Sequence, residues 1–291
     1  MAVSLAGRTA IVTGAGGGLG RTHALLLARA GAKVIVNDIP QSLANAEAVV
    51  EEIRTAGGQA EAAAASVTDE AAVAEMVGKA GAVDILVNNA GILRDKSFAK
   101  MSLDEFRLVM DVHLMGSVIC TKAVWDGMRE RNYGRIVMTT SSSGLYGNFG
   151  QSNYGAAKMA LVGLMQTLSI EGAKTNIKVN CLAPTARTAM TENLLPPQAL
   201  ELLKPDYVSP ALLALVADNA PTRTILAAGA QGVEQAHVTL TRGISIKGLD
   251  DLEAASVILD RLGEIGDPAT ATIPASGLEQ GQLELGKALG A

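Results

Sequence analysis

Short apolar runs typical of buried β-strands alternate along most of this chain with segments that show the apolar periodicity of helices. The strand-like runs fall at about 8–13, 33–37, 59–65, 83–88, 134–140, 176–182 and 223–228. Parallel strands need a helical crossover between them, so this alternation favours a parallel sheet with helices on both faces. We predict an α/β fold with a doubly wound parallel sheet of about seven strands.

The first strand-like run leads directly into a glycine-rich turn. Arg8–Val12 is followed by Thr13-Gly-Ala-Gly-Gly-Gly-Leu-Gly20, and then by a helical pattern that stops at Gly31. Glycines in such a turn let the backbone approach a pyrophosphate, and the helix N-terminus offers it free N–H groups. This Rossmann-type arrangement predicts a dinucleotide site. A purely structural tight turn is the alternative.

The second strand-like run, Lys33–Asn37, ends at Asp38. A carboxylate at this position can accept hydrogen bonds from an adenosine ribose, and it would repel a 2′-phosphate. Gly16 and Gly17 leave the turn without an Arg or Lys to hold that phosphate. We therefore expect NAD in preference to NADP. The alternative is that Asp38 only caps a helix or turn.

Tyr154 and Lys158 are one helical turn apart, and Ser141 follows the strand-like run Arg135–Thr140. An ammonium group near a phenol lowers the phenol pKa from its usual ~10. The Ser141 hydroxyl could hydrogen-bond a substrate oxygen while Tyr154 gives or takes its proton. With a hydride carrier alongside, this set fits alcohol/ketone redox chemistry. On its own, the Tyr-x-x-x-Lys pair is common by chance, and a partly exposed helix face is the more usual explanation of it.

Several candidate site residues come directly after predicted strands. The carboxyl ends of parallel strands share one edge of the sheet, and cofactors bind outside that edge. We therefore expect a single composite site that includes Asp38, Ser66, Asn89, Ser141 and Pro184.

Four motifs occur in the order and at the separations found in the short-chain dehydrogenases/reductases. They are Thr13–Gly20, Asn88-Asn-Ala-Gly91, Ser141 and Tyr154-x-x-x-Lys158. The chain resembles this family over residues 5–230. The resemblance implies an NAD-dependent oxidoreductase that interconverts a secondary alcohol and a ketone, as a homodimer or homotetramer.

Further segments resemble one branch of the family, the dehydrogenase domains of the type 2 peroxisomal multifunctional enzymes. They include Gly91–Phe98, Val112–Gly116 and Tyr146–Gln151. Bacterial relatives of that branch are hydroxyacyl-CoA or hydroxysteroid dehydrogenases. The implied substrate is a (3R)-hydroxyacyl-CoA or a hydroxysteroid. A 3-oxoacyl-carrier-protein reductase is the alternative, and a non-catalytic dinucleotide-binding regulatory protein is a remote one.

The resemblance also implies roles for individual residues. Those that would contact the cofactor, from pyrophosphate to nicotinamide, are Gly14, Gly18, Leu19, Gly20, Asp38, Ser66, Val67, Asn89, Ala90, Gly91, Tyr154, Lys158, Pro184 and Thr188. Those that would act in catalysis are Ser141, Tyr154, Lys158 and His113. His113 stands where the family often has an Asn, so it either supports a proton relay or simply packs within its helix.

Residues 185–210 are apolar and are interrupted by Pro196, Pro197 and Pro205. A mobile lid with an apolar inner face suits an acyl chain or a sterol, so we expect this segment to be the substrate loop. A surface helix pair packed on the core or on a partner subunit is the alternative.

The composition limits the classes of protein to consider. Aromatic residues make up only 3% of a chain that is 48% hydrophobic, and the net charge of −5 argues against a nucleic-acid surface. There is no run of 18 apolar residues, and the N-terminus lacks a signal-peptide pattern. Cys120 and Cys181 look like reduced core residues, and the three His and two Cys are too scattered for a metal site. The expected location is therefore cytoplasmic.

The end of the chain is less regular. We expect residues 1–248 to form a single NAD-binding domain and residues 249–291 a helix, Asp250–Leu262, followed by a tail. This extension would pack on the core or on a partner subunit. The alternating pattern of residues 236–247 predicts a strand.

Overall fold

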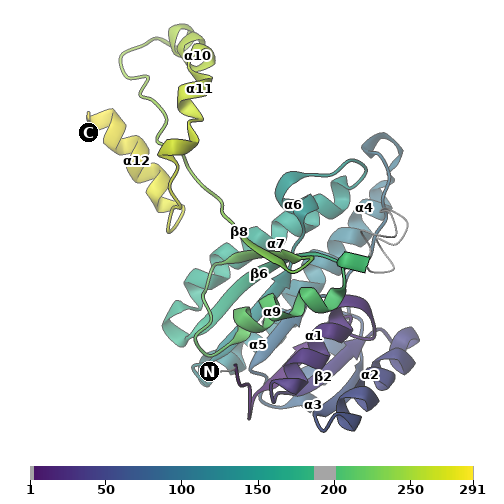
Figure 1. Ribbon diagram of the computed structural model, residues 1–291. Helices are drawn as coiled ribbons and strands as arrows, with labels where there is room; N and C mark the ends of the chain where they lie inside the picture. The colour runs from purple at the N-terminus through teal and green to yellow at the C-terminus, as the bar shows by residue number, and fades with distance from the viewer. Residues whose placement is uncertain (1–2, 187–200, 291) are drawn as a thin grey trace. The chain divides into compact units, whose positions relative to one another are not determined.

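The computed structural model describes residues 3–186 and 201–290 of this chain. An eight-stranded sheet is flanked by helices on both faces (Figure 1), in the strand order β3-β2-β1-β4-β5-β6-β7-β8. All pairs from β3 to β7 are parallel. The strands are β1 (Thr9–Val12), β2 (Lys33–Asp38), β3 (Gln59–Ala64), β4 (Ile85–Asn88), β5 (Gly134–Thr139), β6 (Ile177–Thr185), β7 (Ile225–Gly229) and β8 (Gly232–Ala236). The predicted α/β doubly wound sheet is confirmed, with one strand more than expected.

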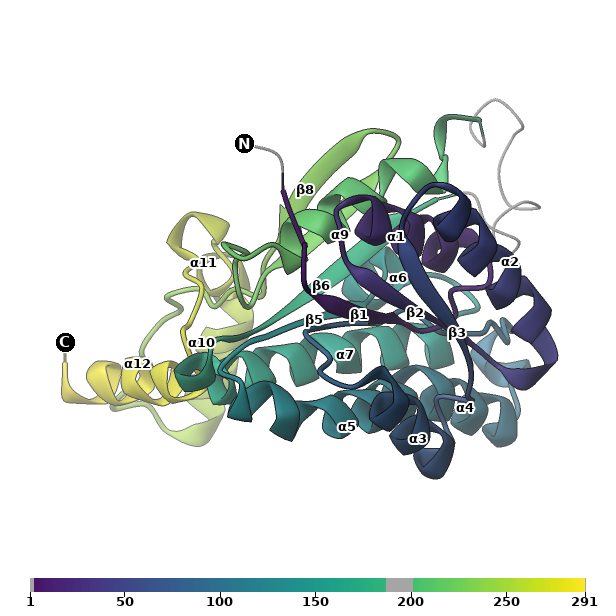
Figure 2. The ribbon, with the colours of Figure 1, turned by 90° about the horizontal axis from the view of Figure 1, so that it is seen from below.

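Helices cover the two faces of the sheet in separate groups (Figure 2). One face carries α1 (Gly18–Arg29), α2 (Leu43–Thr55) and α9 (Ser209–Val216). The opposite face carries α3 (Glu70–Ala80), α4 (Leu103–Met110), α5 (Gly116–Glu130) and α7 (Ser152–Glu171). The central strands are fully buried between these layers, which explains their continuous apolar runs.

The eighth strand escaped the sequence analysis because it has no apolar run. In β8 the exposed side chains Val233, Glu234 and Gln235 stand between partly buried ends. A two-residue loop joins it to β7, and both loop residues, Ala230 and Gln231, have positive φ. This is the conformation of a tight hairpin turn, but neither residue is among the Gly, Asn and Asp that normally signal one.

One long helical segment passes the length and composition test for a membrane span. It runs from Leu103 to Glu130 through α4, a π-helical turn at Asp111–Met115 and α5, and it contains 28 residues. Core helices of globular proteins pass the same test. Here α5 packs against β4, β5 and α3, which is the environment of a core helix.

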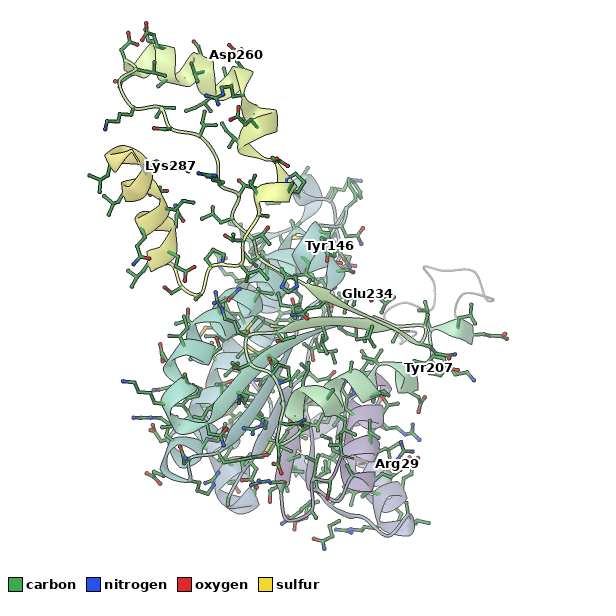
Figure 3. The ribbon with its side chains drawn as sticks, turned by 60° about the vertical axis from the view of Figure 1, so that its left-hand side comes forward. Arg29, Tyr146, Tyr207, Glu234, Asp260 and Lys287 are labelled. Atoms are coloured by element: carbon green, nitrogen blue, oxygen red, sulfur yellow. The ribbon has the colours of Figure 1, made fainter. Side chains whose placement is uncertain are left out.

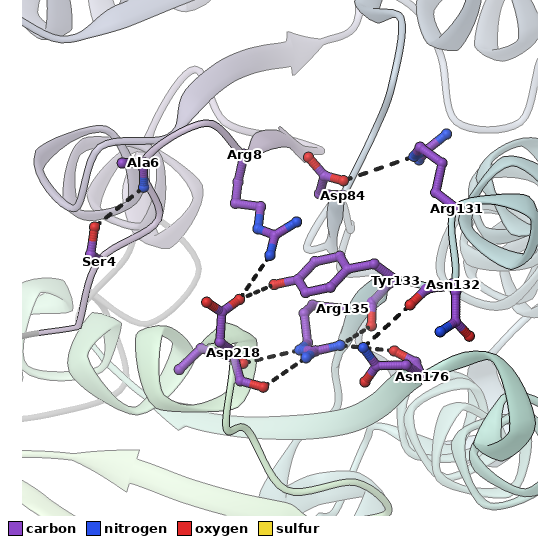
Figure 4. Close-up of polar contacts among 12 residues, drawn as sticks. Ser4, Ala6, Arg8, Asp84, Arg131, Asn132, Tyr133, Arg135, Asn176 and Asp218 are labelled. Atoms are coloured by element: carbon purple, nitrogen blue, oxygen red, sulfur yellow. Dashed lines mark hydrogen bonds and ion pairs between the residues drawn. The ribbon is translucent and has the colours of Figure 1, made fainter.

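A buried arginine lies at the amino end of β5, away from the edge where the site was predicted. The Arg135 guanidinium stacks on the Tyr133 ring, with Arg8 on the other face of that ring (Figure 4). The Tyr133 hydroxyl and Arg8 both donate to Asp218. The Arg135 guanidinium also donates to the backbone carbonyls of Gly134, Asn176, Ala217 and Asp218. These bonds satisfy a charge that is only 1% exposed and tie β5 to the ends of β6 and α9.

The chain divides into two compact units, Met1–Gln235 and Ala236–Ala291. The boundary expected after residue 248 therefore falls inside the second unit. That unit contains α10 (Asp251–Asp260), α11 (Leu262–Ile265) and α12 (Leu278–Leu289), and Figure 3 labels Asp260 and Lys287 within it. The helix expected from residue 250 is confirmed. The strand expected at 236–247 is wrong, because β8 ends at Ala236 and in the rest of that range only Leu240 makes a bridge, to Thr272.

Candidate active site

The glycine-rich turn brings two loops into close contact at the carboxyl edge of the sheet. Gly14 and Gly18 have positive φ, and a Cβ on Gly14 would lie 2.8 Å from Ala90 Cα. A Cβ on Gly20 would overlap the Gly14 carbonyl oxygen. Helix α1 begins at Gly18 without a side-chain cap and without an acidic residue in its first turn. Its first N–H groups therefore remain available to an anion, and the turn fits a pyrophosphate.

Thr13, for which the sequence analysis proposed no role, joins these two loops. Its hydroxyl oxygen accepts hydrogen bonds from the backbone N–H groups of Asn89 and Ala90, both at 3.0 Å. The Asn89 amide in turn donates to the carbonyls of Thr13 (2.9 Å) and Gly14 (3.1 Å). The sequence feature that could have identified Thr13 is its hydroxyl, which follows directly on an otherwise apolar strand. These bonds fix Asn89, Ala90 and Gly91 beside the glycine turn.

Asp38 lies at the end of β2, next to the same turn. One carboxylate oxygen accepts the Gly16 N–H at 2.9 Å, and the other accepts the Ile39 N–H at 2.8 Å. The turn-stabilising role considered as an alternative is therefore present. Each carboxylate oxygen keeps a second lone pair, so the same side chain could still accept a ribose hydroxyl.

The neighbouring loop after β3 contains Ser66 and Val67. The Ser66 hydroxyl lies 2.9 Å from that of Thr68, and Val67 is buried against Gly116 at the start of α5. Pro184 belongs to the last part of β6, in register with Ala228. Thr188 lies outside the described residues, as does most of the predicted substrate loop.

Helix α7 places Tyr154 and Lys158 on one face, as predicted. Lys158 Nζ lies 5.4 Å from the centroid of the Tyr154 ring and donates to the Thr139 carbonyl at 2.6 Å. Ser141 follows β5 and caps the short helix α6 (Ser142–Tyr146). Gly144 in α6 allows the close approach of α7, because a Cβ there would lie 2.8 Å from Lys158 Cβ. The structure thus brings the three predicted residues together at one edge of the sheet.

Burial dominates the electrostatics of this pair. It lowers the pKa of Lys158 to about 7. It also raises the pKa of Tyr154, while a hydrogen bond with Ser141 lowers that pKa and the charge of Asp95 raises it. The expectation that Lys158 lowers the Tyr154 pKa is therefore wrong for the protein alone. In the protein without its cofactor, the burial of the phenol outweighs the hydrogen bond with Ser141 that favours the phenolate.

A hydrogen-bonded chain that was not predicted from the sequence supports this site. The Gln151 amide donates to Asp95 at 2.7 Å, and its carbonyl accepts the Ser143 hydroxyl, also at 2.7 Å. The Ser143 N–H donates to the Ser141 hydroxyl at 3.1 Å. This series of hydrogen bonds therefore connects Asp95 to Ser141. No sequence pattern marks these bonds, because the residues come from three separate segments: the loop at Asp95, the start of α6 and the residue before α7.

His113 occupies the middle of the π-helical turn between α4 and α5. Its ring meets the Tyr154 ring edge-on, with 5.2 Å between centroids. It is thus next to the predicted catalytic set. Among the described residues, no group of three or more His, Cys, Asp or Glu is placed to hold a metal ion.

Aromatic side chains are exposed on the segments that flank this set. Tyr146 at the end of α6 (Figure 3) and Phe149 beyond it are largely in solvent. A hydrogen bond of 2.9 Å from the Lys96 N–H to the Gly150 carbonyl holds a second segment alongside, and this segment presents the exposed Phe98. Tyr146, Phe149 and Phe98 thus form an exposed aromatic rim on the segments that flank the site.

Known proteins similar to this chain share both its sequence and its fold. The peroxisomal multifunctional enzyme A of Dictyostelium discoideum is 47% identical over 86% of the chain and 58% of its own length. The solved full-length peroxisomal multifunctional enzyme type 2 of Drosophila melanogaster aligns with a TM-score of 0.83 and 38% identity, over 99% of this chain and 50% of that one. The chain thus spans about half the length of these relatives.

A third similar protein has been solved with its ligands. It is a 7α-hydroxysteroid dehydrogenase complexed with NADH and 7-oxo glycochenodeoxycholic acid, with a TM-score of 0.73 and 30% identity over 79% of this chain and 95% of that one.

The expected cytoplasmic location is contradicted by these comparisons. Five curated relatives are named as peroxisomal enzymes. The expectation rested on the composition, on two cysteines that look reduced, and on the lack of a signal-peptide pattern and of a long apolar run.

The family model for short chain dehydrogenases matches residues 8–199. This range contains the glycine turn, the Asn89–Gly91 loop and the residues Ser141, Tyr154 and Lys158. The chain belongs to the short-chain dehydrogenase family, and it is an oxidoreductase that acts on CH–OH donors with a nicotinamide dinucleotide.

Proposed function

We propose that this chain is an NAD-dependent dehydrogenase that converts the secondary alcohol of a (3R)-hydroxyacyl-CoA into a ketone. The observation that carries the proposal is the convergence of Ser141, Tyr154 and Lys158 beside the glycine turn. The hydroxyacyl-CoA substrate is supported by the similarity to the peroxisomal multifunctional enzymes. The residues expected to contact the cofactor would hold the dinucleotide, whose nicotinamide supplies the hydride acceptor when bound.

In the proposed reaction, the Ser141 hydroxyl and the deprotonated Tyr154 oxygen bind the substrate hydroxyl. The Tyr154 oxygen takes the hydroxyl proton while the carbon gives up its hydride, so the C–O bond becomes C=O. Because burial raises the Tyr154 pKa, the phenolate needs positive charge nearby. Lys158 provides a cation at 5.4 Å from the ring centroid, and the oxidised cofactor adds another.

The preference for NAD over NADP rests on Asp38. Its carboxylate is fixed by Gly16 and Ile39 at the end of β2, where a 2′-phosphate would meet a negative charge. Replacing Asp38 with Asn would remove the charge and keep the shape, and should reduce the ratio of kcat/KM for NAD to that for NADP. A wild-type enzyme that favours NADP would refute this part of the proposal.

The exposed rim of Tyr146, Phe149 and Phe98 supports an apolar substrate. It does not separate an acyl chain from a steroid, and a hydroxysteroid is therefore the second candidate. A 3-oxoacyl-carrier-protein reductase is a more distant relative and would be expected to use NADPH, against Asp38.

A dehydrogenase screen tests the proposal. NAD and NADP would each be combined with (3R)- and (3S)-hydroxyacyl-CoAs, hydroxysteroids and simple alcohols. We expect the highest kcat/KM for a (3R)-hydroxyacyl-CoA with NAD. Tyr154→Phe should reduce kcat by at least ~10²-fold, the range for loss of a general acid–base, and leave NADH binding nearly intact. Normal turnover by that variant would overturn the mechanism, and no oxidation of any alcohol would overturn the function.

A further inference from the structure

We propose that His113 is a positioning residue that holds the Gly91–Ile92 backbone in place at the cofactor site, and that it does not carry a proton in the reaction. The inference rests on the function proposed above. The sequence alone allowed two roles for His113, a part in a proton relay and packing within its helix.

The hydrogen bonds of His113 are directed at one residue. Its Nε2 atom lies 3.0 Å from the Ile92 backbone nitrogen and 2.8 Å from the Ile92 carbonyl oxygen. In one tautomer Nε2 accepts the Ile92 N–H, and in the other it donates to the Ile92 carbonyl. Both tautomers therefore hold Ile92. The other ring nitrogen, Nδ1, is buried, and among the described residues no side chain or backbone group hydrogen-bonds to it.

The His113 ring also occupies the space next to Gly91. A Cβ on Gly91 would overlap the ring Cε1 and lie 2.9 Å from Nδ1. On the other side of the same loop, the Thr13 hydroxyl binds the N–H groups of Asn89 and Ala90. Thr13 therefore holds the start of the Asn89–Ile92 segment by hydrogen bonds, and His113 holds its end. In this arrangement a histidine at 113 requires a glycine at 91.

The surroundings of the ring favour its neutral form. His113 is only 2% exposed, and burial lowers its pKa to about 3, with a further contribution from the charge of Lys158. The ionisable side chains that face it are Lys158 and Tyr154, and neither is a carboxylate that could stabilise an imidazolium. A ring that stays neutral at working pH can hold a backbone group without changing charge.

The local backbone explains how the ring reaches this position. The helix that carries His113 changes to a π-helical turn at Asp111–Met115, and such turns often mark functional sites. The His113 carbonyl accepts a hydrogen bond of 2.7 Å from the Ser117 hydroxyl. The turn is therefore stabilised by a side chain outside the predicted site.

Three variants test the inference: His113→Ala, His113→Gln and Gly91→Ala. A Gln amide has both a donor and an acceptor for Ile92, but it cannot shuttle a proton at neutral pH. We expect His113→Ala to weaken NADH binding, measured by fluorescence titration, by about tenfold, as loss of one hydrogen bond would. His113→Gln should restore most of that affinity. The pH profile of kcat should be the same in the wild type and both variants.

The outcomes separate the two roles. Equal loss of kcat in the Ala and Gln variants with unchanged NADH affinity, or a shifted pH profile, would overturn the proposal in favour of a relay. Unchanged affinity in His113→Ala would also overturn it. Gly91→Ala should lose NADH binding, and the double variant with His113→Ala should recover part of it. Because NADH binding is read directly, the test holds even if no hydroxyacyl-CoA proves to be a substrate.

Discussion

A buried histidine on helix α1 should make the stability of this protein depend on pH. His23 is fully buried, its Nδ1 lies 2.8 Å from the Ser209 hydroxyl on α9, and its Nε2 has no partner among the described residues. Burial lowers the His23 pKa from 6.5 to about 3. Because the folded state resists a proton that the unfolded chain accepts, stability is complete above pH 6.5 and falls as the pH decreases toward 3.

The size of the effect follows from the two pKa values. Each pH unit between them costs about 1.4 kcal/mol, so lowering the pH to 5 should cost about 2 kcal/mol through His23 alone. The loss would approach about 5 kcal/mol near pH 3. Single domains are commonly stable by about 5–15 kcal/mol, so this loss is easily measured. His113, whose pKa is also lowered to about 3, should act in the same direction.

Urea unfolding at pH 7.5 and pH 5.0 would measure this contribution. The wild type should lose about 2 kcal/mol more free energy of unfolding between the two pH values than His23→Asn. Asn keeps an amide for Ser209 and does not titrate. His237→Asn, in which an exposed histidine is replaced, is the matched control and should behave as the wild type. Equal losses in the wild type and His23→Asn would refute the reasoning.

Three further predictions concern the site. Thr13→Val leaves the Asn89 and Ala90 N–H groups without their acceptor and should destabilise the protein by about 2–4 kcal/mol in urea unfolding; a loss below 0.5 kcal/mol would contradict it. Gly20→Ala should abolish NADH binding, because its Cβ would overlap the Gly14 carbonyl, and normal affinity in a titration would contradict this packing. Asp95→Asn removes a charge that raises the Tyr154 pKa, so the rise of alcohol oxidation with pH should move to lower pH; a shift to higher pH would show that Asp95 acts otherwise.

The sheet and its site edge could be predicted because the strands are buried on both faces and therefore carry unbroken apolar runs. The same reasoning failed for β8, whose exposed residues have no such run. It also failed for residues 236–247, where an alternating pattern found no partner strand. Secondary structure that depends on distant pairing cannot be seen in a local pattern.

The pKa values of the site residues were harder to predict than their positions in the fold. The sequence places Tyr154 and Lys158 one turn apart, but the direction of the Tyr154 pKa depends on burial, which only the packed structure reveals. The Asp95–Gln151–Ser143 chain was missed for the same reason. Its donors and acceptors come from segments far apart in the sequence, and no local periodicity shows that they meet.

The hydrogen bonds between Thr13 and the Asn89–Ala90 backbone have a consequence for the order of folding. They join residues 76 and 77 positions apart, and β1 must pair with β4 before they can form. Such long-range pairing is slow compared with helix formation or local turns. We therefore expect the ability to bind a dinucleotide to arise late in refolding, after most helical signal has returned. A dinucleotide added during refolding would then bind only to molecules in which β1 and β4 have paired. The rate at which NADH fluorescence changes would therefore measure the rate of this last long-range step.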